Sequence, residues 1–510
     1  MSLSKKQEAA SKRPSRKDRA AEVANTFEWL ITAFILAFLF RAFVMEAFRI
    51  PTGSMADTLK GAHFRLCCPQ CGYKYEYGLG NYRLPRDTMP RGYLGEMASR
   101  CPSCGFYQAT GGAMPVAGGD RILVLKCIYQ FFQPKQWDVV VFKNPLDPSE
   151  NYIKRLVGRP RETVEIIDGD VYINGQISRK PPKVQDELWM PVYDNDYPPV
   201  RPREGLFNGH PWEQPFKNVA DSQWKLDQAN PTKFRLDSPA DLVNTMVYDS
   251  SIGNDFRAAY AYDDVRDYRN MPYCSDLMVR LYVRAADSQG RIGIGLSKYE
   301  TNYEAWVDFT GEMVMAKSSK GEEFVELVRS GIEPPAVDKP TLLKFANVDH
   351  ELLFQYGSEI LRCDLGRKPE DAGPRETDIQ PRVKVFGACK MTLSHVAIFR
   401  DIHYTGSKYA NSPIAGRAIE GNPLKLEQDE FFVLGDNSPN SEDGRWWNED
   451  GKGNNNRQYR PGIVPRDYLV GKALFVYWPS GFRPYRAFPL GIIPNVGRIR
   501  FIYGGSAEKP

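Results

Sequence analysis

The strongest constraint on the fold is an apolar segment near the start of the chain, TFEWLITAFILAFLFRAFVMEAF, residues 26–48. It has the length of roughly 20 residues that a helix needs to cross a bilayer core. Only Glu28, Arg41 and Glu46 interrupt it, and the last two are close enough to its end to reach the lipid headgroups. We therefore predict a transmembrane helix over residues 26–48.

Residues 1–25 form a basic segment with almost no large apolar side chains. This composition predicts a disordered tail that stays in the cytoplasm, so that everything beyond about residue 48 lies outside. No later segment is long enough to return, which predicts a single-pass protein of the cell (inner) membrane. A cleaved signal peptide is the alternative, because it also has a basic leader and an apolar centre, but RAFVMEAFRI after Phe40 offers no small-residue cleavage site.

The whole chain has 510 residues, which is too long for one hydrophobic core, so two to four domains are expected. Its 67 basic and 63 acidic residues leave a formal net charge of only +4. That balance gives no reason to expect a nucleic-acid partner. Several domains on the outer side of a membrane are the expectation.

From residue 118 onward, short runs rich in Val, Ile, Tyr and Phe predict mainly antiparallel β structure. TVEIIDGDVYING reads as a hairpin that turns at Asp168 and Gly169. About 250 residues separate it from EFFVLGDNS. They begin with a Pro-rich, acidic linker from Lys180 to about Pro215 and continue with alternating strands such as LMVRLYVRAA, which predicts an inserted two-sheet sandwich. FANVDHELLFQYGSEIL resembles the concanavalin-type jelly roll of laminin-G-like and lectin-like domains.

Four of the nine cysteines form two knuckle turns, CPQCG and CPSCG. Doubled knuckles of this kind are suited to tetrahedral thiolate ligation, so they predict a closed, structural zinc site in a small zinc-ribbon-like insertion. Disulfides are the alternative, since this segment is predicted to lie outside the cell. The candidate ligands are Cys68, Cys71, Cys101 and Cys104. We expect buried free thiols at Cys67, Cys127, Cys274, Cys363 and Cys389.

A serine, Ser54, directly follows the apolar segment in the turn-like run IPTGSMADTL. It needs a base to become a nucleophile, and none of the five histidines lies in a recognisable triad pattern. A lysine can serve instead when burial lowers its pKa. NYIKRLVGRP puts Lys154 on a predicted strand, where a lysine would ordinarily be solvated.

The order of the motifs changes that reading. The basic tail and anchor are followed by IPTGSMADTL, GDRILVLK, NYIKRLVGRP and FVLGDNSPNSEDGR. In this the chain resembles type I signal peptidases, the bacterial leader peptidase family, over roughly residues 27–66, 117–178 and 427–480. The resemblance implies a membrane-anchored β-fold peptidase core, a nucleophile at Ser54, a general base at Lys154 and no cofactor for catalysis.

The resemblance also implies roles around this pair. Thr52 and the backbone N–H of Ser54 hold the oxyanion, Met55 helps line the substrate cleft, and Ser441 orients the lysine amine. The turn under the lysine consists of Gly435, Asp436 and Asn437, and a supporting charged pair consists of Asp443 and Arg445.

The chain departs from the family pattern at three short places. Ser438 stands where the family usually has Arg, Gly444 where it often has Ser, and Arg161-Glu162 where it usually has Gly-Asp. These departures put local turn geometry in doubt rather than the Ser–Lys dyad. The larger departures are the two insertions.

The predicted domain organisation follows from these segments. It consists of a basic cytoplasmic tail at 1–25, a transmembrane helix at 26–48, a discontinuous peptidase core at 49–66, 115–190 and 421–485, a four-cysteine ribbon at 67–114, a concanavalin-like sandwich at 205–410 and a C-terminal extension at 486–510.

We therefore expect a signal peptidase I, a serine endopeptidase that acts on signal-peptide-bearing preproteins at the lipid bilayer. The alternative is a membrane-tethered glycan- or protein-binding protein on an inactive peptidase scaffold. A narrow processing peptidase with few substrates is a closer rival. The sequence gives no ligand for the sandwich.

Overall fold

The computed structural model describes residues 16–79, 97–110, 116–226, 231–264, 271–319, 322–373, 379–406, 416–453, 457–481 and 494–505. Parts of the predicted tail, ribbon, sandwich and C-terminal extension therefore lie outside the described residues. Within the described residues the protein is mainly β, with a single long helix at the N-terminal end. This confirms the predicted fold class in its main features.

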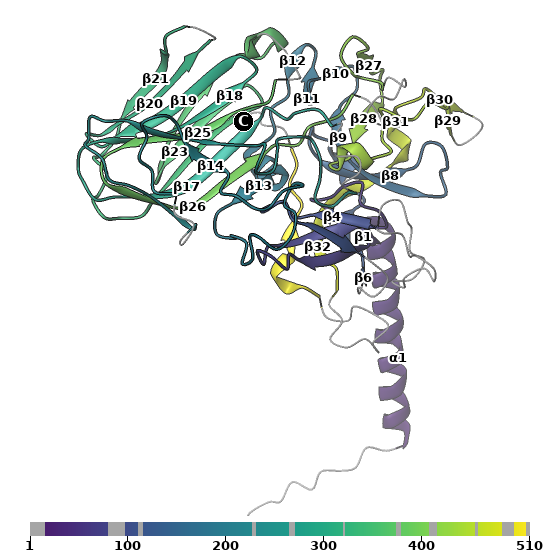
Figure 1. Cartoon of the computed structure of the whole chain (residues 1–510). Coiled ribbons are helices and arrows are strands. Elements are labelled where there is room, and N and C mark those ends of the chain that lie inside the picture. Colours follow the sequence, from purple (N-terminus) through teal and green to yellow (C-terminus); the bar gives the residue numbers. More distant parts are fainter. Residues whose placement is uncertain are drawn as a thin grey trace, which may run out of the picture.

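The long helix α1 (Arg16–Leu39) continues into one π-helical turn, η1 (Phe40–Val44), and projects away from the rest of the molecule (Figure 1). Within residues 22–44, an 18-residue window has a mean hydropathy of 1.9, and none of this window is buried against the rest of the chain. By length and composition this helix is able to cross a membrane.

The helix differs from the predicted span at both ends. It begins at Arg16, inside the segment predicted to be a disordered tail, and it ends before Met45. Residues 45–49 form strand β1 (Met45–Arg49), which pairs with β7 (Arg121–Leu125). Those strand hydrogen bonds hold the last residues of the apolar segment in the folded domain, so the predicted helix to residue 48 is too long.

The first folded unit is an eight-stranded sheet. Its order is β1, β7, β32 (Leu469–Trp478), β8 (Val139–Lys143), β9 (Asn151–Gly158), β28 (Glu430–Leu434) and β31 (Val464–Pro465), with β33 (Arg500–Phe501) pairing to β32. Strand β33 lies within the predicted C-terminal extension at 486–510, and its pairing with β32 attaches this part of the extension to the sheet. Short elements on its connections are α2 (Ile128–Phe131), η4 (Ser438–Asn440), η6 (Arg466–Tyr468), η7 (Val496–Arg498), and the hairpin β29 (Gly451–Lys452) with β30 (Gln458–Tyr459).

The predicted hairpin forms a four-stranded sheet of its own. Its strands are β12 (Gln176–Ile177), β11 (Asp170–Ile173), β10 (Thr163–Ile167) and β27 (Leu424–Lys425). Ile167 pairs with Asp170, so Asp168 and Gly169 make a two-residue turn, and both have positive φ (48° and 86°). This is the turn geometry that an Asp-Gly pair favours in a hairpin.

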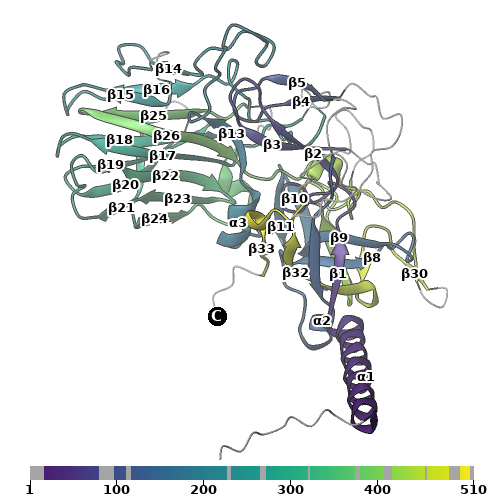
Figure 2. The same ribbon diagram turned by 90° about the horizontal axis from the view of Figure 1, so that it is seen from below.

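Two seven-stranded sheets form the sandwich, which lies beside the eight-stranded sheet and the four-stranded hairpin sheet (Figures 1 and 2). One contains β13 (Met190–Asp194), β26 (Met391–Arg400), β17 (Leu277–Ala285), β22 (Thr341–Val348), β23 (Glu351–Tyr356), β24 (Glu359–Asp364) and β15 (Lys233–Leu236). The other contains β14 (Phe216–Asn218), β16 (Asn244–Tyr248), β25 (Val383–Ala388), β18 (Arg291–Lys298), β19 (Thr301–Asp308), β20 (Glu312–Ser318) and β21 (Val325–Gly331). One helical turn, η3 (Pro369–Ala372), follows β24.

The two sheets share one hydrophobic core. In β17, Val279, Leu281 and Val283 are buried in that core, while Arg280 and Arg284 face solvent. The strand alternation read from the sequence is therefore confirmed here.

The predicted linker from Lys180 to about Pro215 is wrong in its first half. Helix α3 (Pro182–Leu188) and strand β13 lie there, and β13 pairs with β26 in the sandwich. The apolar residues of β13 form an edge strand of the sandwich, and the Pro-rich composition of the segment concealed this strand. Farther along, Phe207 is fully buried in the same hydrophobic cluster as the four knuckle cysteines.

The cysteine region contains two small β elements. One is the three-stranded sheet β3 (Lys74–Gly78), β2 (His63–Cys67) and β6 (Val116–Ala117), and the other is the hairpin β4 (Met97–Arg100) with β5 (Tyr107–Thr110). Residues 80–96 and 111–114 of the predicted ribbon lie outside the described residues.

Candidate active site

Ser54 lies in a tight turn directly after β1. Ile50 N donates to Asp120 O at 2.8 Å, and Ala56 N donates to Gly53 O at 2.9 Å. The first bond attaches the residue before the turn to Asp120, which precedes β7. The second closes the turn around Ser54. The turn thus presents the Ser54 hydroxyl beside the central strands of the core sheet.

Lys154 lies in β9, between strands β8 and β28. Its side chain is almost entirely buried, with 4 % of the residue exposed. Lys154 Nζ is 2.7 Å from Ser54 Oγ, although the two residues are 100 positions apart in sequence. The structure therefore brings together the two residues that the sequence analysis singled out.

The electrostatic setting of Lys154 favours the neutral amine. Burial lowers the pKa of Lys154 from 10.5 to about 8, and the nearby charge of Arg445 acts in the same direction. Asp443, Asp436 and Glu442 act in the opposite direction but do not cancel the effect of burial. A lysine in this state is able to accept a proton near neutral pH.

The loop after β28, residues 435–445, passes under this pair; we call it the GDN loop. Its start is fixed because Leu434 pairs with Arg155, the neighbour of Lys154 in β9. Asn437 N donates to Ser54 O at 3.1 Å. A Cβ on Gly435 would lie 2.5 Å from Ser54 O, so only glycine allows the loop to approach the serine this closely.

Two buried ion pairs hold the GDN loop. Asp443 accepts hydrogen bonds from Arg445 Nε at 2.9 Å and from Gly435 N at 2.9 Å. Asp436 accepts a bidentate pair from Arg155, at 2.7 Å from Nε and 2.6 Å from Nη2. All four side chains are at most 1 % exposed. Such paired, charge-assisted hydrogen bonds fix the geometry of a loop.

Arg155 was not among the residues that the sequence analysis selected. Its signal was present, because a second basic residue follows Lys154 between apolar Ile153 and Leu156 of the same strand. In a buried strand each of two adjacent charged residues needs its own partner, one on each face.

A cleft of about 400 Å³ opens over the Ser–Lys pair. Its walls include Pro51 and Thr52 from the turn after β1, and Tyr152 and Ile153 from β9. Asn440 of the GDN loop also lines it. Thr52 thus borders the cleft, and its role beside an oxyanion stays a prediction.

Two predicted site residues lie differently from expectation. Met55 is fully buried in the core cluster of Ile122 and Val139 and is not among the residues that line the cleft, because the turn points it into the sheet. Ser441 Oγ is buried and makes no hydrogen bond with any described residue, whereas Lys154 Nζ donates to Ser54.

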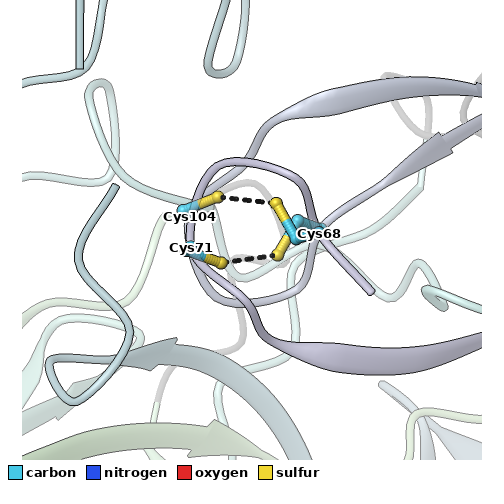
Figure 3. Close-up of side chains that lie close together, drawn as sticks. Cys68, Cys71 and Cys104 are labelled. Carbon is cyan, nitrogen blue, oxygen red and sulfur yellow. Dashed lines mark hydrogen bonds between the residues drawn. The ribbon is translucent and has the colours of Figure 1, made fainter. Parts of the chain in front are cut away.

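The four knuckle cysteines converge on one point, and Figure 3 shows Cys68, Cys71 and Cys104 of this cluster. Cys68 Sγ is 3.7 Å from Cys104 Sγ, and Cys71 Sγ is 3.6 Å from Cys101 Sγ. Sulfurs around a tetrahedral metal ion with bonds of about 2.3 Å lie about 3.8 Å apart. The four thiols could therefore hold a metal ion.

The two knuckles repeat the same backbone geometry. Gly72 N donates to Cys68 O at 2.9 Å and Gly105 N donates to Cys101 O at 3.0 Å, and both glycines have positive φ (76° and 78°). The remaining cysteines are free thiols as expected, but their burial varies. Cys274 and Cys389 are buried, Cys127 and Cys363 are half-buried, and Cys67 is exposed.

Comparison with known proteins agrees with this geometry. The family described as "Signal peptidase, peptidase S26" matches residues 104–210 and 403–478, which include Lys154 and the GDN loop but not Ser54. Two of the segments that line the cleft, around Lys154 and in the GDN loop, thus match this family, whereas the turn that carries Ser54 lies outside the match. Signal peptidase I of Rickettsia canadensis (strain McKiel) is 32 % identical over 149 residues, which are 29 % of this chain and 42 % of that relative. Signal peptidase I of Rickettsia bellii (strain OSU 85-389) is 27 % identical over 184 residues, 36 % of this chain and 49 % of that relative.

These matches confirm the predicted resemblance to type I signal peptidases. The chain spans less than half the length of these relatives. Among solved structures, carbohydrate binding module CBM66 from Bacillus subtilis is 11 % identical, with a TM-score of 0.22, over 37 % of this chain and 92 % of that chain. Galectin LEC-6 from Caenorhabditis elegans is 13 % identical, with a TM-score of 0.19, over 25 % of this chain and 87 % of that chain. TM-scores this low carry no argument about the sandwich, so its concanavalin-like character stays a prediction.

Proposed function

We propose that this chain is a signal peptidase I, a membrane-bound serine endopeptidase that removes signal peptides from exported preproteins. The observation that carries the proposal is the 2.7 Å contact between Lys154 Nζ and Ser54 Oγ at the floor of an open cleft. The lowered pKa of Lys154, about 8, supports it, because only the neutral amine is able to take the serine proton.

In the proposed reaction, neutral Lys154 accepts the proton of Ser54 Oγ while the oxygen attacks the carbonyl carbon of the scissile peptide bond. Thr52 and the backbone N–H of Ser54 stabilise the resulting oxyanion. The lysine ammonium then gives its proton to the leaving amine, and an ester links the signal peptide to Ser54. A water molecule, deprotonated by the same amine, hydrolyses the ester and frees both products.

The GDN loop takes supporting roles in this proposal. Gly435, Asp436 and Asn437 carry the loop past Ser54, and the pair Asp443–Arg445 keeps it rigid. Ser441 is proposed to turn toward the lysine amine when substrate fills the cleft and to orient it for proton transfer.

The proposed setting is the outer surface of a membrane. Helix α1 would anchor the chain with its N-terminus in the cytoplasm, so that the cleft faces the outer side where cleavage sites emerge. The proposed organisation keeps the discontinuous peptidase core, with the cysteine region and a sandwich from β13 to β26 as insertions. The lipid bilayer and signal-peptide-bearing preproteins are the proposed partners.

We further propose that the cysteine cluster binds one structural zinc ion. Four thiolates would close its coordination sphere, so the ion would stabilise the fold next to β2 without taking part in catalysis. We expect about one zinc per chain in the purified protein, and its removal by a chelator lowers the melting temperature. Cys68→Ser abolishes zinc binding, whereas the matched change Cys67→Ser, at an exposed thiol one residue away, retains it. Metal-free protein with Cys68 in a disulfide would contradict the proposal.

The function is tested by cleavage of a preprotein in detergent or lipid, with the cut mapped by mass spectrometry. The proposal predicts that the wild type cuts after a small residue and that Ser54→Ala and Lys154→Met produce no cut. If the wild type is inactive on every preprotein offered, the alternative of a binding protein on an inactive scaffold is favoured. If Lys154→Met cuts at the wild-type rate, another base serves Ser54.

A further inference from the structure

One segment of the sandwich region reaches into the candidate active site. It is the run Tyr260-Ala261-Tyr262-Asp263 between β16 and β17, which we call the YAYD segment. Tyr260 and Tyr262 are buried in one hydrophobic cluster with Ala56, two residues after Ser54, and with Leu434, the last residue before the GDN loop. This cluster is separate from the sandwich core, and it also contains Val157 and Phe432 of the eight-stranded sheet.

The YAYD segment binds the GDN loop by three hydrogen bonds, the longest of which runs from Ser438 N to Tyr260 Oη at 3.5 Å. Tyr260 Oη donates to Asp436 O at 2.8 Å, and Asn437 Nδ2 donates to Asp263 Oδ1 at 2.8 Å. Tyr260 is itself fixed, since it is 5 % exposed and the Arg400 guanidinium lies 5.2 Å from its ring centroid. The YAYD segment thus holds Asp436 and Asn437, the two residues that follow Gly435, where the loop lies close to Ser54.

The same segment also touches the serine side of the cleft. A Cβ on Gly53 would lie 2.3 Å from the Tyr262 ring, so the ring packs directly on the residue that precedes Ser54. On its other side, Gly78 N of β3 donates to Tyr262 O at 2.8 Å. Tyr262 therefore lies between the serine turn and the sheet next to the cysteine cluster.

The exit of the sandwich makes a second attachment to the GDN loop. Thr405 N donates to Ser438 Oγ at 2.8 Å, and Arg445 Nη1 donates both to Thr405 O and to Ser438 Oγ at 2.8 Å. Ser438 is the residue that replaces the usual arginine of the family. Its short hydroxyl leaves room for the inserted chain at the place where the family pattern has a long side chain.

We propose that Tyr260 and Asp263 are positioning residues for the Ser54–Lys154 pair, so that the sandwich insertion is a working part of the active site. This inference rests on the proposed function. Through these contacts the YAYD segment holds both the turn that carries Ser54 and the GDN loop in fixed positions. Removal of the insertion would leave Asp436 O and Asn437 without these partners and would loosen the loop under Lys154.

The test compares Tyr260→Phe, Asp263→Ala and their combination with the wild type in the full chain. We expect each single change to lower kcat roughly 10-fold, because small displacements of a reacting group are costly, while KM changes less than about 2-fold. We also expect the pKa of Lys154 to rise in these variants, since a looser cleft admits water to the amine. That pKa is read from the pH dependence of Lys154 acetylation by acetic anhydride, followed by mass spectrometry.

Two further variants separate positioning from general damage. Asp263→Asn keeps an acceptor oxygen and is expected to recover most of kcat. Tyr248→Phe is the matched control, because Tyr248 Oη also donates to a backbone carbonyl, Asn254 O at 2.9 Å, but within the sandwich. It should leave kcat and the Lys154 pKa unchanged.

The inference is overturned if Tyr260→Phe and Asp263→Ala match Tyr248→Phe in both kcat and Lys154 pKa. It fails separately from the proposed function. If the wild type cuts no preprotein, the acetylation profile of Lys154 still decides: a raised pKa in the two variants supports positioning, and an unchanged pKa contradicts it.

Discussion

Two regions of this molecule bury lysine side chains, and the consequences are opposite. In the cleft, Lys154 donates to the neutral hydroxyl of Ser54 at 2.7 Å, and burial lowers its pKa to about 8. Where the β10–β11 hairpin meets the sandwich, Lys180 and Lys298 are equally buried, yet their pKa values are raised well above 10.5. Carboxylates account for the difference.

At the hairpin–sandwich junction each ammonium touches two carboxylates. Lys298 Nζ is 3.4 Å from Asp170 and forms a shorter contact with Asp276. Lys180 Nζ is 2.9 Å from Asp401 and also contacts Asp349. Attraction to these anions exceeds the cost of burial, so both lysines stay charged and join the two parts of the chain.

In the cleft the nearest carboxylates are already engaged. Asp436 is bound by Arg155, and Asp443 is bound by Arg445. The two arginines hold these anions away from the lysine amine and partly neutralise their field. Burial therefore dominates at Lys154, and the comparison teaches that burial lowers the pKa of a lysine only where no carboxylate is free to pair with the amine.

The largest expected effect is that of Lys154→Met. We predict a fall in cleavage of at least about 1,000-fold, because the base for Ser54 is lost. The free energy of unfolding should be unchanged or slightly higher, since an uncompensated buried amine is removed. Cleavage assays and urea unfolding of the same preparation measure both quantities. A large loss of stability would place Lys154 with the structural lysines instead.

Lys298→Met should lower the free energy of unfolding and leave cleavage unchanged. Loss of this ammonium leaves Asp276 and Asp170 buried without it, at a cost of about 3–5 kcal/mol in the free energy of unfolding. Protein that remains folded should still cleave, because Lys298 has no contact with the cleft residues. Urea unfolding with a matched exposed change, Lys339→Met, measures the difference. Equal stability of these two variants would contradict the structural role of the junction.

Ser54→Asp is expected to give Lys154 a carboxylate partner like those of Lys180 and Lys298. A carboxylate in contact with Lys154 should raise the lysine pKa by about 2 units, as a close opposite charge does elsewhere. The acetylation profile of Lys154 reports this shift without requiring activity. Ser54→Asn, a neutral residue of the same shape, should leave the pKa near that of the wild type. If both variants give the same pKa, the carboxylate explanation is wrong.

The smallest effect is predicted for Glu442→Gln. The charge of Glu442 raises the pKa of Lys154, but its side chain is exposed and screened by solvent. Its removal should move the pH profile of cleavage to lower pH by a few tenths of a unit, as estimated for an exposed charge. Glu449→Gln, also exposed and in the same segment, is the control and should not move the profile.

Sequence alone predicted the parts of the site that depend on local motifs. Ser54, Lys154 and the GDN loop were identified because each lies in a short recognisable run, and the hairpin turn was identified because Asp-Gly favours a particular backbone geometry. The doubled Cys-Pro-x-Cys-Gly runs likewise revealed four residues that lie together in the structure.

What the sequence concealed depends on contacts between distant segments. Tyr260 and Asp263 are ordinary loop residues until the fold brings them against Asp436 and Asn437. The strand in the predicted linker, β13, is recognisable only because β26 offers an edge for it. Likewise, apolar composition alone did not show that residues 45–48 leave the helix to form β1, since helix and strand residues overlap there.

The measurement that tests the central claim most directly is the pH dependence of kcat/KM for cleavage of a preprotein by the wild type. A neutral amine must accept the serine proton, so activity is low when Lys154 is protonated and rises as pH increases through its pKa. The account predicts about a tenfold rise per pH unit below a pKa of about 8 and a plateau above it. A profile that is flat between pH 6 and pH 9, or that keeps rising beyond pH 10, would contradict the assignment of Lys154 as the buried, neutral base.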